Sequence, residues 1–348
     1  MDAPPVRIGV IGCGRIAQVA HLPAVVKADG LELKAVCDPS ETLARGVAAR
    51  YGVVGCTDTG DLLAQPLDAV LIAAPDRLHL PLGVQALDAG RHVLVEKPAA
   101  DTAAHAAELL ASAESAGRKL QIGAMRRHDP GLAYATAAVA DLGTVLTATS
   151  WYRIPAMLRQ PTEAALFPPL VVDDAVRARE SGFKADRERY LLLTHGAHVF
   201  DTLRLLLGEL TSVRAQVARS AGGRDFSWHG TSRLAAGGLV SFEIAADVHG
   251  EYAEGIEIYG EHGHVSLRSS FPFFRHASRV RVHLDRTGET RTPEFGASDP
   301  YQRQAEAFAR AIVTDTPTDP SGADGVAALR LIEAVAASAA ADGKDVAP

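Results

Sequence analysis

A glycine-rich turn near the N-terminus constrains the fold more than any other feature of this 348-residue chain. The pattern G-x-G-x-x-A occupies Gly12, Gly14 and Ala17, between an apolar strand predicted for residues 7–11 and a helix predicted from about Arg15. The first glycine permits a tight turn, the second lets the backbone approach a pyrophosphate, and the alanine lets the helix pack closely on the strand. The helix N-terminus then presents free N–H groups to phosphate oxygens. The pattern therefore predicts the first βαβ unit of a dinucleotide-binding domain.

An acidic residue at the end of the second predicted strand favours one dinucleotide. Asp38 lies 21 positions after Ala17 (38 − 17), near the ~20 expected for an acid that binds ribose hydroxyls. Its carboxylate would repel the 2′-phosphate of NADP, and Pro39 and Ser40 provide no arginine to bind that phosphate. We therefore expect NAD as the cofactor, with NADP the weaker alternative. The cofactor-binding residues predicted from this unit are Gly12, Gly14, Arg15, Ile16 and Asp38.

The periodicity of apolar residues divides the chain into two domains. Short apolar segments alternate with helical patterns up to residue 124, which is typical of a parallel sheet covered by helices. From residue 143 the strands alternate polar and apolar residues, as one-sided antiparallel sheets do, and the one helix predicted among them covers residues 198–207. We predict a Rossmann domain with a doubly wound parallel sheet at residues 1–124. Residues 125–348 are predicted to form an α+β domain with an open, mainly antiparallel sheet, whose last helices can pack back on the first domain.

Composition and charge exclude several classes of protein. The formal net charge is −7, the isoelectric point is about 6.0, and no run of five Lys or Arg residues occurs, so nothing predicts nucleic-acid binding. No segment approaches the ~18 consecutive apolar residues that a membrane span needs. The three cysteines, Cys13, Cys37 and Cys56, are an odd number and do not suggest a disulfide framework. We expect reduced thiols and a cytoplasmic protein.

Residues 155–189 fit no regular element. The segment contains four prolines and then the charge-rich stretch VVDDAVRARESGFKADRER. A loop of this length within a compact domain is usually functional or disordered, and both a lid or substrate-contact loop and plain disorder remain open. Its arginines Arg159, Arg177 and Arg179 could bind the phosphates of a substrate.

Five short motifs follow the glycine turn along nearly the whole chain. AAPDRLHLPLGVQAL contains the pattern P-(N/D)-x-x-H, and HVLVEKPAA contains Glu-Lys-Pro at residues 96–98. IGAMRRHDPGL, IEIYGEHGHVSL and DPYQRQAEAFARAI complete the series. In order and spacing these motifs resemble the Gfo/Idh/MocA family, which includes glucose–fructose oxidoreductase and inositol dehydrogenase. The resemblance implies oligomer contacts through the C-terminal sheet, in a homodimer or homotetramer. It also implies cofactor-binding roles for Pro75, Asp76, His79, Glu96 and Lys97.

One position departs from the family pattern. The family usually has D-x-G-x-H-x-x-D, whereas this chain has Thr194-His-Gly-Ala-His-Val-Phe-Asp201. A threonine can hydrogen-bond a substrate hydroxyl, but it cannot act as a carboxylate base near neutral pH. We therefore place Thr194 among the substrate-binding residues and expect Asp201 to be structural, in the first turn of the predicted helix.

Lys97 is the predicted acid/base of the reaction. Oxidation of a secondary alcohol transfers a hydride to a nicotinamide and a proton to a base. Lys97 follows a parallel strand, where open α/β sheets place their ligands, and burial beside a positively charged nicotinamide would lower its pKa toward the working range. An exposed turn lysine is the alternative interpretation.

Other polar residues are predicted to assist at the substrate. His198 can relay a proton or hydrogen-bond the reacting oxygen; a histidine at a helix N-terminus that bonds only the backbone is its alternative. His195 could offset the missing acid by contacting the substrate. The two form H-x-x-H, but no third ligand is apparent nearby, so no metal is predicted. Arg127 is placed at the substrate, with a surface salt bridge as its alternative, and Tyr152 could line the site or pack on the sheet.

These predictions lead to one main functional hypothesis. We expect an NAD-dependent dehydrogenase or ketoreductase that acts on a CH–OH group of a polyhydroxylated small molecule: a sugar, cyclitol, glycoside or amino sugar. The first alternative is the same chemistry on a nucleotide-linked or acyclic substrate. The second is a catalytically silent NAD-binding regulator, which the threonine at position 194 motivates.

Overall fold

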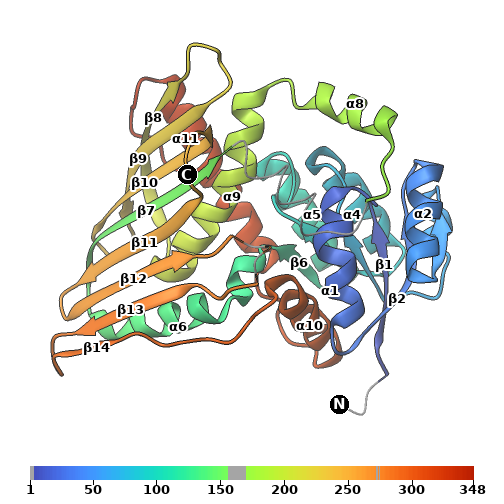
Figure 1. Ribbon diagram of the computed structural model, residues 1–348, viewed down its shortest axis with the longest axis horizontal. Coiled ribbons are helices and arrows are strands. Elements are labelled where there is room, and N and C mark those ends of the chain that lie inside the picture. Colours follow the sequence, from blue (N-terminus) through green and yellow to red (C-terminus); the bar gives the residue numbers. More distant parts are fainter. Residues whose placement is uncertain (1–3, 156–169, 272, 274) are drawn as a thin grey trace. The chain divides into compact units, whose positions relative to one another are not determined.

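The computed structural model describes residues 4–155, 170–271, 273 and 275–348, which form two compact units (Figure 1). Unit 1 comprises Met1–Met125, Leu166–Asp186 and Tyr301–Val326. Unit 2 comprises Arg126–Ala165, Arg187–Pro300 and Ala327–Pro348. The chain therefore passes between the units several times, and a single domain boundary at residue 124 stays a prediction.

Unit 1 is built on a six-stranded sheet with the order β3-β2-β1-β4-β5-β6, and its strand pairs are all parallel. This confirms the predicted doubly wound parallel sheet. The strands are β1 (Val6–Ile11), β2 (Leu31–Cys37), β3 (Val54–Cys56), β4 (Ala69–Ile72), β5 (His92–Glu96) and β6 (Leu120–Gly123). The central strands are almost wholly apolar because helices cover both faces of such a sheet, and all four residues of β4 are buried.

Local sequence signals determine where the helices of unit 1 begin and end. In α2 (Glu41–Tyr51), the Ser40 Oγ accepts a hydrogen bond from the Leu43 N–H, and Gly52 ends the helix in the left-handed conformation. In α5 (Ala103–Ala116), Thr102 and Gly117 have the same two roles. Such caps satisfy backbone groups that the helix leaves without partners. The remaining helical elements are η1 (Ala17–His21), α1 (Leu22–Lys27), α3 (Thr59–Leu63), η2 (Asp76–Leu78), α4 (His79–Asp88), α8 (Asp174–Phe183) and α10 (Pro300–Val313).

Unit 2 contains an eight-stranded sheet with the order β14-β13-β12-β11-β7-β10-β9-β8. The sheet is mainly antiparallel. Within the described residues, β7 and β10 are the one pair of neighbouring strands in this sheet that runs parallel. The strands are β7 (Val145–Pro155), β8 (Leu210–Arg219), β9 (Phe226–Leu234), β10 (Leu239–Val248), β11 (Ala253–Gly260), β12 (Gly263–Ser269), β13 (Arg279–Leu284) and β14 (Glu289–Arg291). The predicted open, mainly antiparallel sheet is confirmed, and Figure 1 shows its strands side by side.

Helices pack on one face of this sheet. α6 (Pro130–Val139) contacts β12 and β13, and α9 (Arg187–Leu207) contacts β7 and β10. The short helical turns η3 (Met125–His128) and η4 (Ala140–Leu142) flank α6. Within the described part of the chain, no helix has both the length and the apolar character needed to cross a bilayer.

Two predictions about residues 155–207 are wrong. The segment 155–189 is not one irregular loop, because it contains all of α8 and the start of α9; its residues 156–169, with Arg159, lie outside the described residues. The predicted helix at 198–207 is the second half of α9. Asp201 therefore lies in a helix interior and not in a first turn. Charged residues concealed α8 and the first residues of α9, where apolar positions are few.

The last helix, α11 (Gly322–Ala340), is tied to the sheet of unit 2 by a buried serine. The Ala215 N–H in β8 donates to the Ser338 Oγ at 2.8 Å, and this hydroxyl donates to the Lys344 carbonyl at 2.6 Å. Beyond the helix, Val346 forms a bridge with Val213 of the same strand. The C-terminal segment thus covers the β8 edge of the sheet.

We predict that Ser338→Ala lowers the free energy of unfolding by about 1–3 kcal/mol, because the buried Ala215 N–H and the partly buried Lys344 carbonyl lose their partner. Urea denaturation followed by circular dichroism would measure the change. Ser112→Ala is the matched control, because the exposed bond of the Ser112 hydroxyl goes to the Glu108 carbonyl of its own helix. It should change stability by no more than about 0.5 kcal/mol, and equal effects of the two substitutions would contradict the prediction.

Candidate active site

The candidate site of unit 1 is the carboxyl edge of its parallel sheet. The strand order reverses at β1, which pairs with β2 on one side and with β4 on the other. In open α/β sheets, ligands bind beyond the carboxyl ends of the strands at such a reversal. The glycine turn follows β1 and Asp38 follows β2, while Glu96 ends β5 and Lys97 comes directly after it, so all lie at this edge.

The two glycines of the turn lie in different surroundings. Gly12 has φ +96°, and a Cβ atom there would lie 2.6 Å from the Ala73 carbonyl oxygen, so the fold itself requires glycine. Among the described residues, and apart from its chain neighbours, a Cβ on Gly14 would meet no atom within 4 Å. The backbone at Gly14 therefore faces open space, as a close approach of a pyrophosphate needs. The helical residues that follow, exposed Arg15 and half-buried Ile16, lie where the backbone can face the phosphates.

Asp38 joins the ends of β1 and β2. Its Oδ2 accepts a hydrogen bond from the Cys13 N–H and its Oδ1 one from the Ser40 N–H, both at 2.9 Å. Burial raises the pKa of Asp38 despite these two backbone donors. Because a carboxylate oxygen can accept more than one hydrogen bond, Asp38 keeps acceptor capacity for ribose hydroxyls. These residues fit a dinucleotide.

The predicted P-D-x-x-H segment connects two strand ends. Pro75 and Asp76 follow β4, and His79 begins α4. The His79 ring is buried, with Nδ1 2.8 Å from the Pro98 carbonyl and Nε2 2.9 Å from the Ala74 carbonyl. Burial lowers the pKa of His79, against the effect of these carbonyls. The ring thus lies between the carbonyl of Ala74, after β4, and that of Pro98, directly after Lys97.

Glu96 ends β5 and forms a buried pair that the sequence did not reveal. Its Oε1 lies 2.7 Å from the Nε2 of His21, and both side chains are buried. Burial alone would raise the pKa of Glu96, but the hydrogen bond to His21 and the positive charge of Lys97 lower it. An ionised carboxylate therefore stands beside half-buried Lys97.

A polar cluster in unit 2 gathers the residues predicted to contact the substrate. Thr194, His195 and His198 lie on α9, where positions three or four apart share a face. The ring of Tyr152, on β7, lies 5.2 Å from that of His195 and stacks on that of His198 at 6.0 Å. Both histidines and the tyrosine are buried. The cluster brings two imidazoles and a phenol together, a set suited to hydroxyl groups.

Arg127 forms a buried ion pair and not a surface salt bridge. Its Nε lies 3.0 Å from both carboxylate oxygens of Asp201, and its Nη2 lies 2.7 Å from Oδ1. Each side chain is only 6% exposed. The pair attaches η3 to α9, on the same helix as His198.

A second buried ion pair was not predicted. Arg126 donates to Tyr252 at 2.6 Å and to Glu254, and Tyr252 packs edge-on against Tyr152. Burial raises the pKa of Tyr252. Charge neutralisation explains why two adjacent arginines can both be buried: Asp201 pairs with Arg127, and Glu254, on β11, pairs with Arg126.

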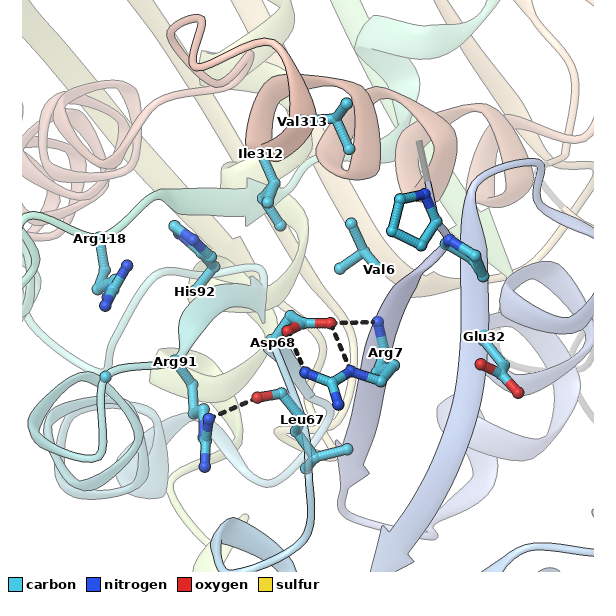
Figure 2. A pocket seen from close by; sticks show the side chains of 13 residues that line it. Val6, Arg7, Glu32, Leu67, Asp68, Arg91, His92, Arg118, Ile312 and Val313 are labelled. Carbon is cyan, nitrogen blue, oxygen red and sulfur yellow. Dashed lines mark hydrogen bonds and ion pairs between the residues drawn. The ribbon is translucent and has the colours of Figure 1, made fainter. Parts of the chain in front are cut away.

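The opposite edge of the unit 1 sheet has a hollow of about 690 Å³ (Figure 2). It is lined by the first residues of several strands, including Val6, Glu32 and His92, together with Asp68. The Arg7 Nη2 lies 2.7 Å from the Asp68 Oδ1 there. Since the hollow lies at the amino ends of the strands, it takes no part in the site at the carboxyl edge.

The cysteines of unit 1 are free and buried. Burial raises the pKa of Cys37 to about 12, and it raises that of Cys13 as well. These thiols are therefore not nucleophiles at neutral pH. In the described ranges, no group of three His, Cys, Asp or Glu side chains could hold a metal ion.

Comparisons with known proteins agree with this geometry. Residues 6–124 match the oxidoreductase family model with an NAD-binding Rossmann fold, and residues 141–266 match the GFO/IDH/MocA C-terminal domain. Inositol 2-dehydrogenase 1 of Saccharopolyspora erythraea is 32% identical, over 94% of this chain and 92% of its own. dTDP-3,4-didehydro-2,6-dideoxy-alpha-D-glucose 3-reductase of Streptomyces violaceoruber is 30% identical, over 88% of this chain and 85% of its own.

A solved structure shows the same fold at lower identity. Aldose-aldose oxidoreductase from Caulobacter crescentus superposes with a TM-score of 0.80 at 22% identity, covering 99% of this chain and 100% of that one. With both domain models matched in order, the chain belongs to the Gfo/Idh/MocA family of oxidoreductases, with an NAD-binding Rossmann fold.

Proposed function

We propose that this enzyme interconverts a secondary alcohol and a ketone on a sugar, cyclitol, glycoside or amino sugar, with NAD as the cofactor. The observation that carries the proposal is the common edge of unit 1, where the glycine turn, Asp38 and Lys97 follow strands of one parallel sheet. When bound there, a nicotinamide supplies the hydride acceptor or donor. The chain itself must then bind the dinucleotide and move one proton.

Lys97 is the proposed acid/base. It is half-buried, it follows β5, and the negative charge of Glu96 lies next to it. His21 keeps that carboxylate ionised within the core. A lysine amine at a strand end can take a proton from a hydroxyl in one direction and return it in the other.

His198 is proposed to assist at the reacting oxygen. Its ring is held by stacking on Tyr152, and the Arg127–Asp201 pair anchors the next turn of α9. Thr194, His195 and Tyr152 are proposed to hydrogen-bond substrate hydroxyls. A neutral threonine at position 194 leaves the proton transfer to Lys97 and His198.

The names of the two relatives support two classes of substrate. One is called an inositol dehydrogenase and the other a reductase of a dTDP-linked sugar. A free cyclitol or sugar is the main proposal, and a nucleotide-linked sugar is the second candidate. Membership in a family of oxidoreductases argues against the silent regulator.

We predict that Lys97→Ala lowers kcat by about 10²–10⁴-fold, because the proton loses its acceptor. NADH absorbance would be followed with NAD and a panel of inositols, hexoses, glycosides, amino sugars and sugar nucleotides. Lys119→Ala is the matched control, because Lys119 precedes β6 at the opposite edge and pairs with Asp315. Full activity of Lys97→Ala on a substrate that the wild type oxidises would refute the assignment.

The buried His21–Glu96 pair predicts a pH effect. Because His21 lowers the pKa of Glu96, His21→Leu should raise that pKa and move the acidic limb of kcat/KM upward by about one pH unit. The ionised carboxylate would then be lost at a higher pH than in the wild type. His21→Gln retains a donor and should restore part of the shift. Superimposable pH profiles for the wild type and His21→Leu would show that the pair does not act on Lys97.

Substitutions at the two glycines of the turn should have different effects, one on the stability of the fold and the other on NAD binding. Gly12→Ala should destabilise the fold by at least about 1 kcal/mol, because of its positive φ and the clash with Ala73. Gly14→Ala should leave the melting temperature unchanged but weaken NAD binding about tenfold or more, since the added methyl meets only the bound pyrophosphate. Calorimetry measures both quantities, and unchanged affinity in Gly14→Ala would place the pyrophosphate elsewhere.

A further inference from the structure

A segment from far along the chain crosses the proposed cofactor edge of unit 1. We call residues 171–180 the strap; it includes most of α8 and follows the part of the chain that lies outside the described residues. Val171 packs against the apolar core of unit 1. The glycine at position 46 makes room for Val171, because a Cβ atom on Gly46 would lie 2.8 Å from the Val171 Cγ1.

Three polar side chains, each near the end of a different strand, attach the strap to unit 1. The buried Gln18 side chain bonds the Val171 backbone N–H and carbonyl, both at 2.9 Å, and also donates to the Cys13 carbonyl of the glycine turn. The Ser40 Oγ, after β2, donates to the Asp173 Oδ2 at 2.6 Å. Arg77, after β4, holds both oxygens of Glu180, at 3.1 and 2.9 Å.

The length of the strap agrees with this crossing. Asp173 and Glu180 are seven residues apart, which is about 10 Å along a helix at 1.5 Å per residue. β2 and β4 are separated by β1 alone, so their spacing is also about 10 Å. The strap therefore runs across the end of β1, the strand that carries the glycine turn.

The crossing places a second carboxylate beside Asp38. Ser40 joins the two acids, because its N–H donates to Asp38 and its hydroxyl donates to Asp173. The negative charge of Asp173 contributes to the raised pKa of Asp38, and Arg179 of the strap acts in the opposite direction. Two carboxylates and one guanidinium leave this group with a net negative charge.

We propose that Asp173 is a second determinant of dinucleotide specificity: beside Asp38 it accepts a hydrogen bond from the adenosine ribose and repels a 2′-phosphate. The inference rests on the proposed NAD-dependent function and extends its specificity to a residue 135 positions (173 − 38) beyond Asp38. A ribose diol offers two donors to two acceptors. The ribose of NADP keeps only the 3′-hydroxyl as a donor, and its 2′-phosphate adds negative charge beside two carboxylates.

The test compares Asp173→Asn with Asp174→Asn by calorimetric titration of the intact protein with NAD and with NADP, in the absence of substrate. Asparagine caps helices about as well as aspartate: its one oxygen can accept from the Ala175 and Val176 N–H groups as Asp173 Oδ1 does, and its NH2 can donate to the Ser40 Oγ, so α8 should stay in place. Asp174→Asn is the matched control, because it removes the same charge from the next residue, whose exposed side chain pairs, within the described part of the chain, with Arg177.

The ratio of the two dissociation constants, NADP over NAD, should fall about tenfold or more in Asp173→Asn, because two like charges near a protein surface interact by several times RT. It should change less than about twofold in Asp174→Asn, whose exposed charge is screened. Equal ratios in the two variants would overturn the proposal. A shifted ratio with no turnover of any alcohol would overturn only the proposed function, and failure of the wild type to bind either dinucleotide would overturn both.

Discussion

The hydrogen bonds that the Asp38 carboxylate accepts from Cys13 and Ser40 hold the candidate site of unit 1 together. They join the glycine turn after β1 to the end of β2 through one side chain. The same side chain is the acid expected to bind the ribose, so one residue has both a structural role and an expected binding role. Ser40 extends the arrangement, because it also caps α2 and donates to Asp173. A local turn, a helix start and a distant segment thereby converge on one place.

Elsewhere the protein keeps charge in its interior by pairing it. Glu96 is buried against His21, Arg127 against Asp201, and Arg126 against Glu254. An isolated buried charge costs several kcal/mol, whereas a paired and hydrogen-bonded one is tolerated. Each pair stands beside a residue proposed to act on substrate: Lys97 in unit 1, and His198 and Tyr152 in unit 2. The positive charge of Lys97 contributes to the lowered pKa of Glu96, and Tyr252, which bonds Arg126, packs edge-on against Tyr152.

The site could be predicted from the sequence where its residues are close together along the chain. The glycine turn, the Glu-Lys-Pro motif and the His-x-x-His spacing are local patterns whose geometry follows from strand ends and helical periodicity. Asp38 is also of this kind, since the βαβ unit sets its distance from the turn. By contrast, His21, Tyr252, Glu254 and Asp173 have no local signal. Each becomes part of a site only through a partner at least 75 residues away or through packing of remote elements.

The sequence alone determined the parallel sheet of unit 1, the mainly antiparallel sheet of unit 2 and the family, because apolar periodicity and short motifs are properties of neighbouring residues. Only the tertiary structure decided which distant segments return to unit 1. The charge-rich stretch after residue 170 looked like a loop because few of its residues are apolar. Long-range contacts with Gln18, Ser40 and Arg77 turn it into a strap over the glycine turn. Such contacts depend on how the whole chain packs, and the sequence near residue 173 does not contain that information.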